Sequence, residues 1–321
     1  MPFGIVCDID GVLVKERCVI EGAEEALCSL IDARSQKFAA PILFVTNGGN
    51  CTPSQRAESL SLLLPSVPDI TADRVMVAHS PLEGKKELRD QRLLLVATHA
   101  EVAHAVAKEY GWTSYSVATD LCDDHPYLFP YRKHSFTPDQ LTIPLHEQEP
   151  FQSVIIISTP LDWAEMLQLI VDVLLPIKGK QCTTLYAANP DLVYSNEYCV
   201  PRLTTGAFIS CLRTLYQEFT GIPLRFEYVG KPLSITYEYA QRRMKEICPN
   251  VERFYAIGDN PLSDIQGANA SGDGWQSILV LSGVYSGPDN HPTHPAHHVC
   301  ATITEALQYI RSREASLDRT H

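Results

Sequence analysis

Positive charge is scarce in this sequence. Its 321 residues include 26 lysines and arginines against 38 aspartates and glutamates, which gives a formal net charge of −12. A chain this acidic repels the phosphates of nucleic acids and anionic membrane surfaces, so we expect neither as a partner. Long apolar runs are also missing. The stretch at residues 167–175 is short and is interrupted by Asp172, so it predicts no membrane span.

Closely spaced cysteine pairs are absent as well. None of the ten cysteines forms a Cys-x-x-Cys pair, and Cys7, Cys28, Cys182 and Cys211 lie in apolar segments. We therefore expect reduced core cysteines in an intracellular protein. The N-terminus has neither a basic n-region nor an Arg- and Ser-rich leader. Because the first predicted strand begins at Phe3, the sequence leaves open a longer precursor, and with it a cytoplasmic or mitochondrial location.

Apolar runs of strand length alternate with helical periodicity, which predicts an α/β fold with a parallel sheet. The predicted strands are residues 3–7, 41–45, 93–97, 154–157, 183–186, 254–257 and 277–281. The predicted helices are residues 22–37, 53–64, 101–110, 161–175, 205–219, 233–248 and 302–313. Residues 120–150 are rich in Pro, His, Asp and Tyr and indicate a loop. The simplest arrangement is a doubly wound core of residues 1–80 and 190–321, with a second α/β domain of residues 81–189 inserted into it.

Two carboxylates follow the first predicted strand. Asp8 ends the apolar run, Asp10 comes two residues later, and Gly11 allows a sharp turn. A carboxylate is a competent nucleophile toward phosphorus, and a second one can protonate the leaving oxygen and then activate water. Taken alone, the pair also fits a plain turn with two solvated aspartates.

Polar side chains also follow the second predicted strand. Thr46, Asn47 and Gly48 come directly after this apolar run. A hydroxyl and the N–H groups of a glycine turn can hold phosphate oxygens. An ordinary strand-to-helix turn has the same pattern, so this motif needs the others for its meaning.

Two further motifs lie in the C-terminal part. Lys231 precedes the predicted helix at 233–248 and would direct its positive charge toward a phosphate, although a surface lysine is the alternative. Asp259 follows the strand at 254–257 and offers a hard oxygen ligand to Mg²⁺. Asp264 comes one helical turn later, where it could orient Lys231 or a metal-bound water. An N-capping aspartate is the alternative for either acidic residue.

The four motifs in this order resemble those of the haloacid dehalogenase superfamily. The matching segments are DIDGVL at 8–13, VTNGG at 45–49, GKP at 230–232 and GDNPLSDIQGA at 258–268. The insertion between the second and third motifs is similar to the large α/β cap of subclass IIA, which includes 4-nitrophenylphosphatase. Within that subclass the chain most resembles the cat-eye-syndrome critical region protein family, on residues 186–191 followed by 206–208.

The resemblance implies a role for each site residue. Asp8 would be the nucleophile and a Mg²⁺ ligand, and Asp10 the acid and base, with its backbone carbonyl on the metal. Thr46, with Asn47 and Gly48, would bind the phosphoryl group, and Lys231 would neutralise the intermediate. The remaining residues would be Asp259 as the other metal ligand and Asp264 as its support. The dehalogenase branch lacks the second aspartate, so Asp10 favours phosphate-ester hydrolysis.

The expected activity is a Mg²⁺-dependent phosphatase acting on small phosphorylated metabolites, such as a sugar phosphate, a glycerol phosphate or a nucleoside monophosphate. The inserted domain is expected to close over the site and select the leaving group. Two alternatives remain open at this point: a binding protein with weak or vestigial turnover, and a phosphotransferase in which an alcohol replaces water. The sequence also leaves open whether the protein forms a homo-oligomer.

Overall fold

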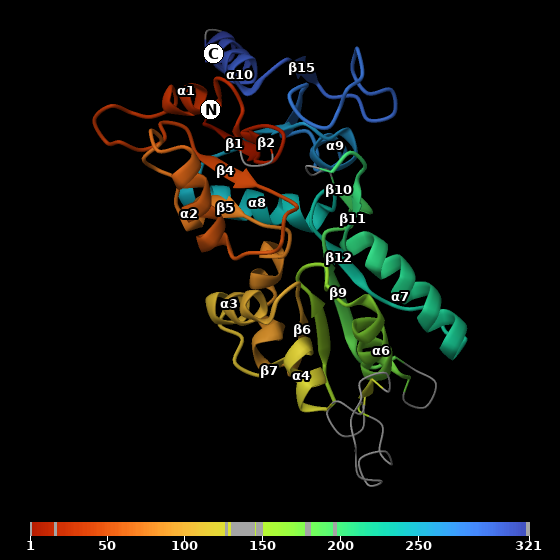
Figure 1. Ribbon diagram of the computed structural model, residues 1–321. Helices are drawn as coiled ribbons and strands as arrows, with labels where there is room; N and C mark the ends of the chain where they lie inside the picture. The colour runs from red at the N-terminus through yellow and green to blue at the C-terminus, as the bar shows by residue number, and fades with distance from the viewer. Residues whose placement is uncertain are drawn as a thin grey trace, which may run out of the picture. The chain divides into compact units, whose positions relative to one another are not determined.

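The computed structural model describes residues 2–15, 18–125, 128–129, 145, 150–176, 181–194 and 198–318. The chain forms two compact units. The first consists of Met1–Asn47, Pro53–Ser80 and Gly230–His321, and the second of Gly48–Thr52 and Pro81–Val229. In Figure 1 the first unit carries both ends of the colour bar, and the second unit carries the yellow and green between them. The loop expected at residues 120–150 lies mostly outside the described residues.

A six-stranded parallel sheet forms the centre of the first unit, in the order β15-β14-β13-β1-β4-β5. Its strands are β1 (Phe3–Asp8), β4 (Ile42–Val45), β5 (Val75–Met76), β13 (Arg253–Gly258), β14 (Trp275–Val280) and β15 (His298–Cys300). The chain moves outward from β1 to β5 and later from β13 to β15 on the other side. The strand order therefore reverses between β1 and β13. In open parallel sheets, ligands bind at such a switch point, beyond the carboxyl ends of the strands.

Both faces of this sheet are covered, which explains the continuous apolar runs in its strands. Ile5 and Phe44 pack in one cluster with α1, α2 and α10, whereas Val6 and Leu43 pack in another with α8 and α9. This alternation follows from the two-residue period of a strand. The helical segments are α1 (Ala23–Cys28), α2 (Pro53–Leu63), η1 (Ala72–Arg74), α8 (Ser234–Ile247), η6 (Pro261–Ile265), α9 (Gln266–Ala270) and α10 (Ile303–Asp318). A small hairpin is formed by β2 (Val14–Lys15) and β3 (Cys18–Val19).

The second unit has its own parallel sheet, in the order β12-β9-β8-β6-β7. Its strands are β6 (Leu93–Val96), β7 (Tyr115–Val117), β8 (Ser153–Ile156), β9 (Thr184–Ala188) and β12 (Glu227–Val229). Its helices are α3 (Ala100–Tyr110), α4 (Ala118–Asp124), α6 (Trp163–Leu174) and α7 (Thr205–Thr220), with 3-10 turns η2 (Ser80–Gly84) and η3 (Lys86–Asp90). Residues of α4, α6 and α7 share one core with the sheet, and α3 contacts β6 and β7. A hairpin joins β10 (Val193–Tyr194) to β11 (Arg202–Leu203). Together the two units form the expected fold class: a doubly wound α/β core with an inserted α/β domain.

The second joint between the units differs from the expected one near residue 190. Residues 190–229 belong with the second unit, because β12 pairs with β9 and α7 buries Phe208, Leu212 and Tyr216 in that unit's core. Both interactions join residues that the local sequence pattern cannot connect.

The first predicted helix is also shorter than expected. We predicted residues 22–37, but α1 ends at Cys28. The Asp32 carboxylate accepts hydrogen bonds from the N–H groups of Arg34 and Ser35, and Gln36 has a φ of 55°. A short polar side chain that bonds to the following backbone in this way favours a turn over a helix.

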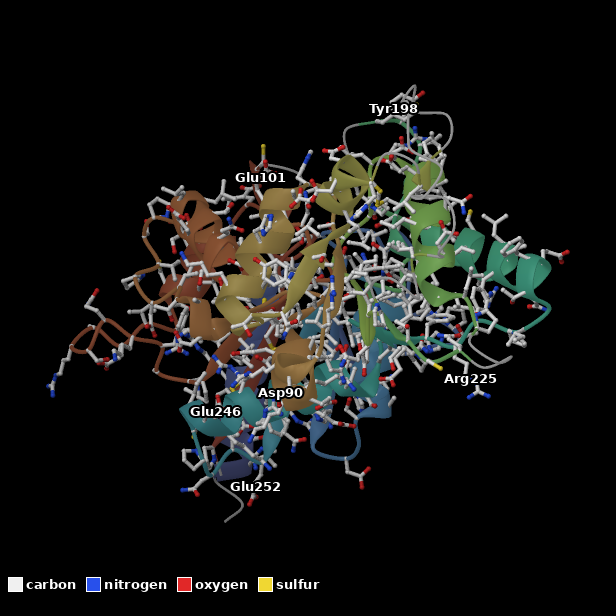
Figure 2. The ribbon with its side chains drawn as sticks, turned by 90° about the horizontal axis from the view of Figure 1, so that it is seen from below. Asp90, Glu101, Tyr198, Arg225, Glu246 and Glu252 are labelled. Atoms are coloured by element: carbon white, nitrogen blue, oxygen red, sulfur yellow. The ribbon has the colours of Figure 1, made fainter. Side chains whose placement is uncertain are left out.

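Some of the acidic side chains that the sequence has in excess lie on the surface. Glu101, Glu246 and Glu252 are exposed and extend away from the ribbon in Figure 2. Within the described parts of the chain, no helix combines the length and the apolar character that crossing a membrane requires.

Candidate active site

Three of the four predicted motifs meet at one edge of the first unit's sheet. Asp8 is the last residue of β1, Thr46 directly follows β4, and Asp259 directly follows β13. These three strands are neighbours, with β1 in the middle. Parallel strands end at the same edge, so the sheet brings together residues that are far apart in the sequence.

Lys231 reaches the same edge by another route. It follows β12, which pairs with β9 in the second unit's sheet. Its Nζ donates to Oδ1 of Asp8 and to Oδ1 of Asp264, both at 2.7 Å, and to the Val45 carbonyl at 3.3 Å. Asn47 bonds the backbone of Lys231 twice, accepting from its N–H at 2.8 Å and donating to its carbonyl at 2.9 Å. Asn47 is expected from the sequence to bind substrate, and in the structure its side chain also holds the backbone of Lys231 in place.

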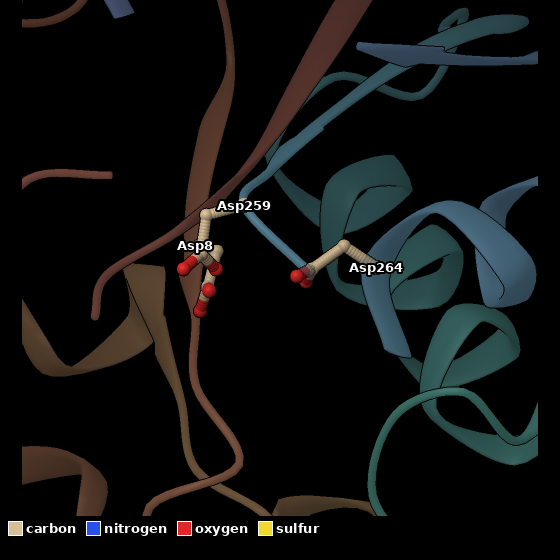
Figure 3. Close-up of side chains that lie close together, drawn as sticks. All are labelled: Asp8, Asp259 and Asp264. Carbon is tan, nitrogen blue, oxygen red and sulfur yellow. The ribbon is translucent and has the colours of Figure 1, made fainter. Parts of the chain in front are cut away.

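Three buried carboxylates gather at this point. The oxygens of Asp8, Asp259 and Asp264 lie within 4.8 Å of one another. Figure 3 shows Asp8 and Asp259 side by side, with Asp264 projecting toward them from the neighbouring helical segment. Oδ2 of Asp259 accepts a hydrogen bond from the Val284 N–H at 2.6 Å, and the Tyr237 hydroxyl donates to the Asp264 carbonyl at 2.9 Å.

Burial away from water and nearby charges shift the pKa values of Asp8, Asp259 and Lys231. Burial, and next the charge of Asp264, raise the pKa of Asp8 well above its ordinary value. The same two causes raise the pKa of Asp259 to about 6. Burial alone would lower the pKa of Lys231, but Asp264 and Asp8 raise it well above the usual range. The amine is therefore a permanent cation, and the carboxylates are groups whose negative charge needs further compensation.

A divalent metal ion fits this charge distribution. The acidic and basic side chains that the contacts above join at this site are Asp8, Asp10, Asp259, Asp264, Lys231 and Arg56. When all are ionised, four negative charges face two positive ones, which leaves a net charge of −2. Carboxylate oxygens are hard ligands of the kind that Mg²⁺ prefers. The donor set and the charge deficit both fit Mg²⁺.

Two glycines keep space free beside one carboxylate. A Cβ atom on Gly11 would lie 2.1 Å from Oδ2 of Asp259, and one on Gly283 would lie 1.9 Å from the same oxygen. Neither position tolerates a side chain, and Gly11 also has a φ of +88°. The glycine that the sequence explained by a sharp turn therefore also allows Asp259 to approach.

Asp10 is held at both of its carboxylate oxygens. Oδ2 accepts from the Thr46 hydroxyl at 2.7 Å, and Oδ1 accepts from Nη2 of Arg56 at 2.8 Å. Arg56 was not predicted from the sequence, where its one unusual feature is a positive charge in the first turn of α2. Thr46 was expected to hold a phosphoryl group, and in the structure its hydroxyl contacts Asp10. Gly48, also expected to bind substrate, groups with the second unit.

Two family models match the chain. Residues 5–113 match haloacid dehalogenase-like hydrolase, and residues 228–306 match HAD-hydrolase-like. The chain is 30% identical to a cardiolipin synthase (CMP-forming)/mitochondrial hydrolase fusion protein of Schizosaccharomyces pombe, with 97% of this chain aligned. It spans 54% of that protein's length. It is 29% identical to a mitochondrial hydrolase of Saccharomyces cerevisiae, with 94% of each protein covered.

Solved structures share the fold. A p-nitrophenyl phosphatase from Archaeoglobus fulgidus has a TM-score of 0.67 at 17% identity, covering 96% of this chain and 99% of that one. A glycerol phosphate phosphatase from Mycobacterium tuberculosis, in complex with magnesium, has a TM-score of 0.63 at 21% identity, covering 95% and 75%. The site motifs, the two sheets and the two matching family models together show that the chain belongs to the haloacid dehalogenase-like hydrolases.

Proposed function

We propose that this hydrolase is a Mg²⁺-dependent phosphatase that cleaves small phosphomonoesters through an aspartyl-phosphate on Asp8. The observation that carries the proposal is the contact of Lys231 with Asp8 beside Asp259, with Asp10 held two residues from the nucleophile. A buried cation next to a carboxylate nucleophile reduces its repulsion from a phosphate dianion.

The reaction follows from these positions. Oδ1 of Asp8 already accepts bonds from Lys231 and from the Ile9 N–H, so Oδ2 is the oxygen that attacks phosphorus. The bond from phosphorus to the ester oxygen breaks, and Asp10 gives that oxygen a proton. Asp10 then takes a proton from water, whose oxygen attacks phosphorus. The bond from phosphorus to Asp8 breaks, and inorganic phosphate leaves.

Asp8 and Asp259 are the side chains that would hold Mg²⁺, together with the backbone carbonyl of Asp10. When bound, the metal would supply positive charge to the phosphoryl oxygens. Asp264 is placed to keep Lys231 beside Asp8, because Nζ bonds both carboxylates at the same distance. It is the one carboxylate of the buried trio that we do not assign to the metal.

Substitution of the nucleophile tests the proposal. Asp8→Asn keeps the size of the side chain and removes its nucleophilic charge, so phosphate release should fall by about 10⁴-fold or more. The substrates would be p-nitrophenyl phosphate, glycerol phosphate and a nucleoside monophosphate, each with Mg²⁺. Asp273→Asn, at an exposed loop position, is the matched control and should keep full activity.

Mass spectrometry of acid-quenched wild-type enzyme should find a phosphoryl group on Asp8. Phosphate release that Asp8→Asn leaves unchanged would show that the proposal is wrong. Phosphorylated alcohol products, found when alcohols are added, would instead identify a phosphotransferase.

The substrate and compartment extend the same proposal. Phosphatases of this fold act on p-nitrophenyl phosphate and glycerol phosphate in other organisms, so we propose a small phosphorylated metabolite here. Both curated relatives are named as mitochondrial, which makes the mitochondrion the first compartment to test with a tagged full-length protein. A tag signal confined to the cytoplasm would rule that compartment out.

A further inference from the structure

Among the described residues, Arg56 forms an ion pair with one carboxylate, that of Asp10. Its side chain is 19% exposed, and Nη2 donates to Oδ1 of Asp10 at 2.8 Å. The Asp10 side chain is 57% exposed, and its other oxygen accepts from the Thr46 hydroxyl. A carboxylate in this position could turn freely if nothing held it. Two donors from different elements, one after β4 and one on α2, fix the plane of the carboxylate.

Local physics disfavours an arginine at this position. The first turn of a helix carries the positive end of the helix dipole, where a cation is unfavourable. Nε of Arg56 is also buried and has no hydrogen-bond partner among the described residues. An unsatisfied buried donor is costly, and a partly exposed ion pair contributes little stability in return. The placement of Arg56 therefore calls for a reason other than folding.

We propose that Arg56 is a positioning residue that aims the Asp10 carboxylate at the leaving oxygen of the substrate. This inference rests on the phosphatase function proposed above. A carboxylate offers about four lone-pair directions, so bonds to Arg56 and Thr46 leave sites where Asp10 carries and receives the proton. Arg56 does not touch the substrate in this role. It acts through Asp10 alone.

Leaving-group dependence separates this role from substrate binding. The value of kcat/KM reports the steps up to aspartyl-phosphate formation, in which Asp10 protonates the leaving oxygen. Phenyl phosphate needs that proton, whereas 2,4-dinitrophenyl phosphate releases a stable anion without it. General acid catalysis contributes about 10²–10⁴-fold, so Arg56→Met should lower kcat/KM for phenyl phosphate by about 10–100-fold. The loss for the dinitrophenyl ester should stay within about 3-fold, since that ester draws little on the acid.

Three further variants sharpen the test. Arg56→Lys keeps one charged donor and should restore part of the lost activity. Arg56→Met in an Asp10→Asn background should cause no additional loss, because a residue that acts only through Asp10 has nothing left to position. Arg243→Met removes an arginine from a surface pair with Glu246 and should leave both esters unaffected. Equal losses on both esters, additive losses in the double variant, or no loss on phenyl phosphate would each overturn the proposal.

A crystal structure of Arg56→Met gives an answer that does not depend on turnover. We expect the Asp10 carboxylate in a changed orientation or in more than one. An Asp10 side chain that stays in its original orientation, still bonded to Thr46, would overturn the positioning role even if the wild-type enzyme hydrolysed neither ester. Failure of the phosphatase function itself would appear separately, as wild-type activity that Asp8→Asn does not change.

Discussion

Asp259 shows how one buried carboxylate can make stability depend on pH and on metal. Its pKa in the folded protein is about 6, against an ordinary value of 3.8, first because it is buried and second because Asp264 is near. The folded chain therefore binds this proton more tightly than the unfolded chain does. The stabilisation that comes from this tighter proton binding is complete below about pH 4, and it is lost as the pH rises through about 6.

Magnesium should replace the proton as the compensating charge. We expect Mg²⁺ to raise the melting temperature more at pH 7.5 than at pH 5. At the lower pH Asp259 is mostly protonated, and this proton competes with the ion for the carboxylate. Differential scanning fluorimetry with and without Mg²⁺ at both pH values measures this difference. Asp259→Asn should reduce the Mg²⁺ effect at both. An equal rise at the two pH values would contradict the assignment of Asp259 to the metal.

The helix α10 is attached to the core sheet by a buried carboxylate near its C-terminal end. Glu314 accepts hydrogen bonds from Nε of Arg253 at 3.0 Å and from the Tyr255 hydroxyl at 2.6 Å, and it also contacts Nη2 of Arg253. Burial alone would raise the pKa of Glu314, but the hydrogen bonds from Arg253 and Tyr255 lower it below the ordinary value. The two donors lie on β13, Arg253 at its first position and Tyr255 at its third, whereas Asp259 follows the other end of the strand.

Glu314→Ala tests how firmly this element is attached. The substitution leaves a partly buried guanidinium and a buried hydroxyl without their acceptor, so we expect a loss of about 2–4 kcal/mol in the free energy of unfolding. Glu246→Ala removes an exposed carboxylate that pairs with Arg243 on α8, and should cost at most about 0.5 kcal/mol. Urea unfolding followed by circular dichroism compares the two. A loss for Glu314→Ala no larger than the control's would contradict this role.

Across the whole molecule the structure describes all ten cysteines, and none of them forms a disulfide. Cys7, Cys122 and Cys300 are buried, and Cys18, Cys182, Cys199 and Cys211 are exposed. The expectation of core positions for Cys182 and Cys211 is therefore wrong. Cys211 lies on the outer side of α7, whose buried residues include its neighbours Ile209 and Leu212.

These settings predict how many thiols react in the native protein. Ellman's reagent should label about four thiols rapidly and all ten after denaturation, because it attacks accessible thiolates. Burial raises the pKa of Cys300 to about 11 and raises the pKa of Cys7 well above its ordinary value, which should protect both thiols. Peptide mapping of a labelled sample identifies the reactive positions. Rapid labelling of Cys7 in the folded protein would contradict the buried position of β1.

The sequence predicted the parts of the site that follow core strands and missed those that depend on distant pairing. Asp8, Thr46 and Asp259 could be found because each ends an apolar run, and a parallel sheet then brings them together. Arg56 left no comparable signal, since its partner is 46 residues away in the sequence. The pairing of β12, the strand before Lys231, with β9 could not be predicted either, because sheet partners are chosen by tertiary contacts.

The position of the second joint has a practical consequence for building chimeric enzymes. The chain leaves the inserted unit at Val229, two residues before Lys231. A cassette that ends at residue 189 would lack both α7 and the edge strand β12, which pairs with β9. The helix left behind in the donor chain would then have Phe208, Leu212 and Tyr216 uncovered. A transplant of this insert should therefore end after Val229, leaving the recipient's own glycine and lysine untouched.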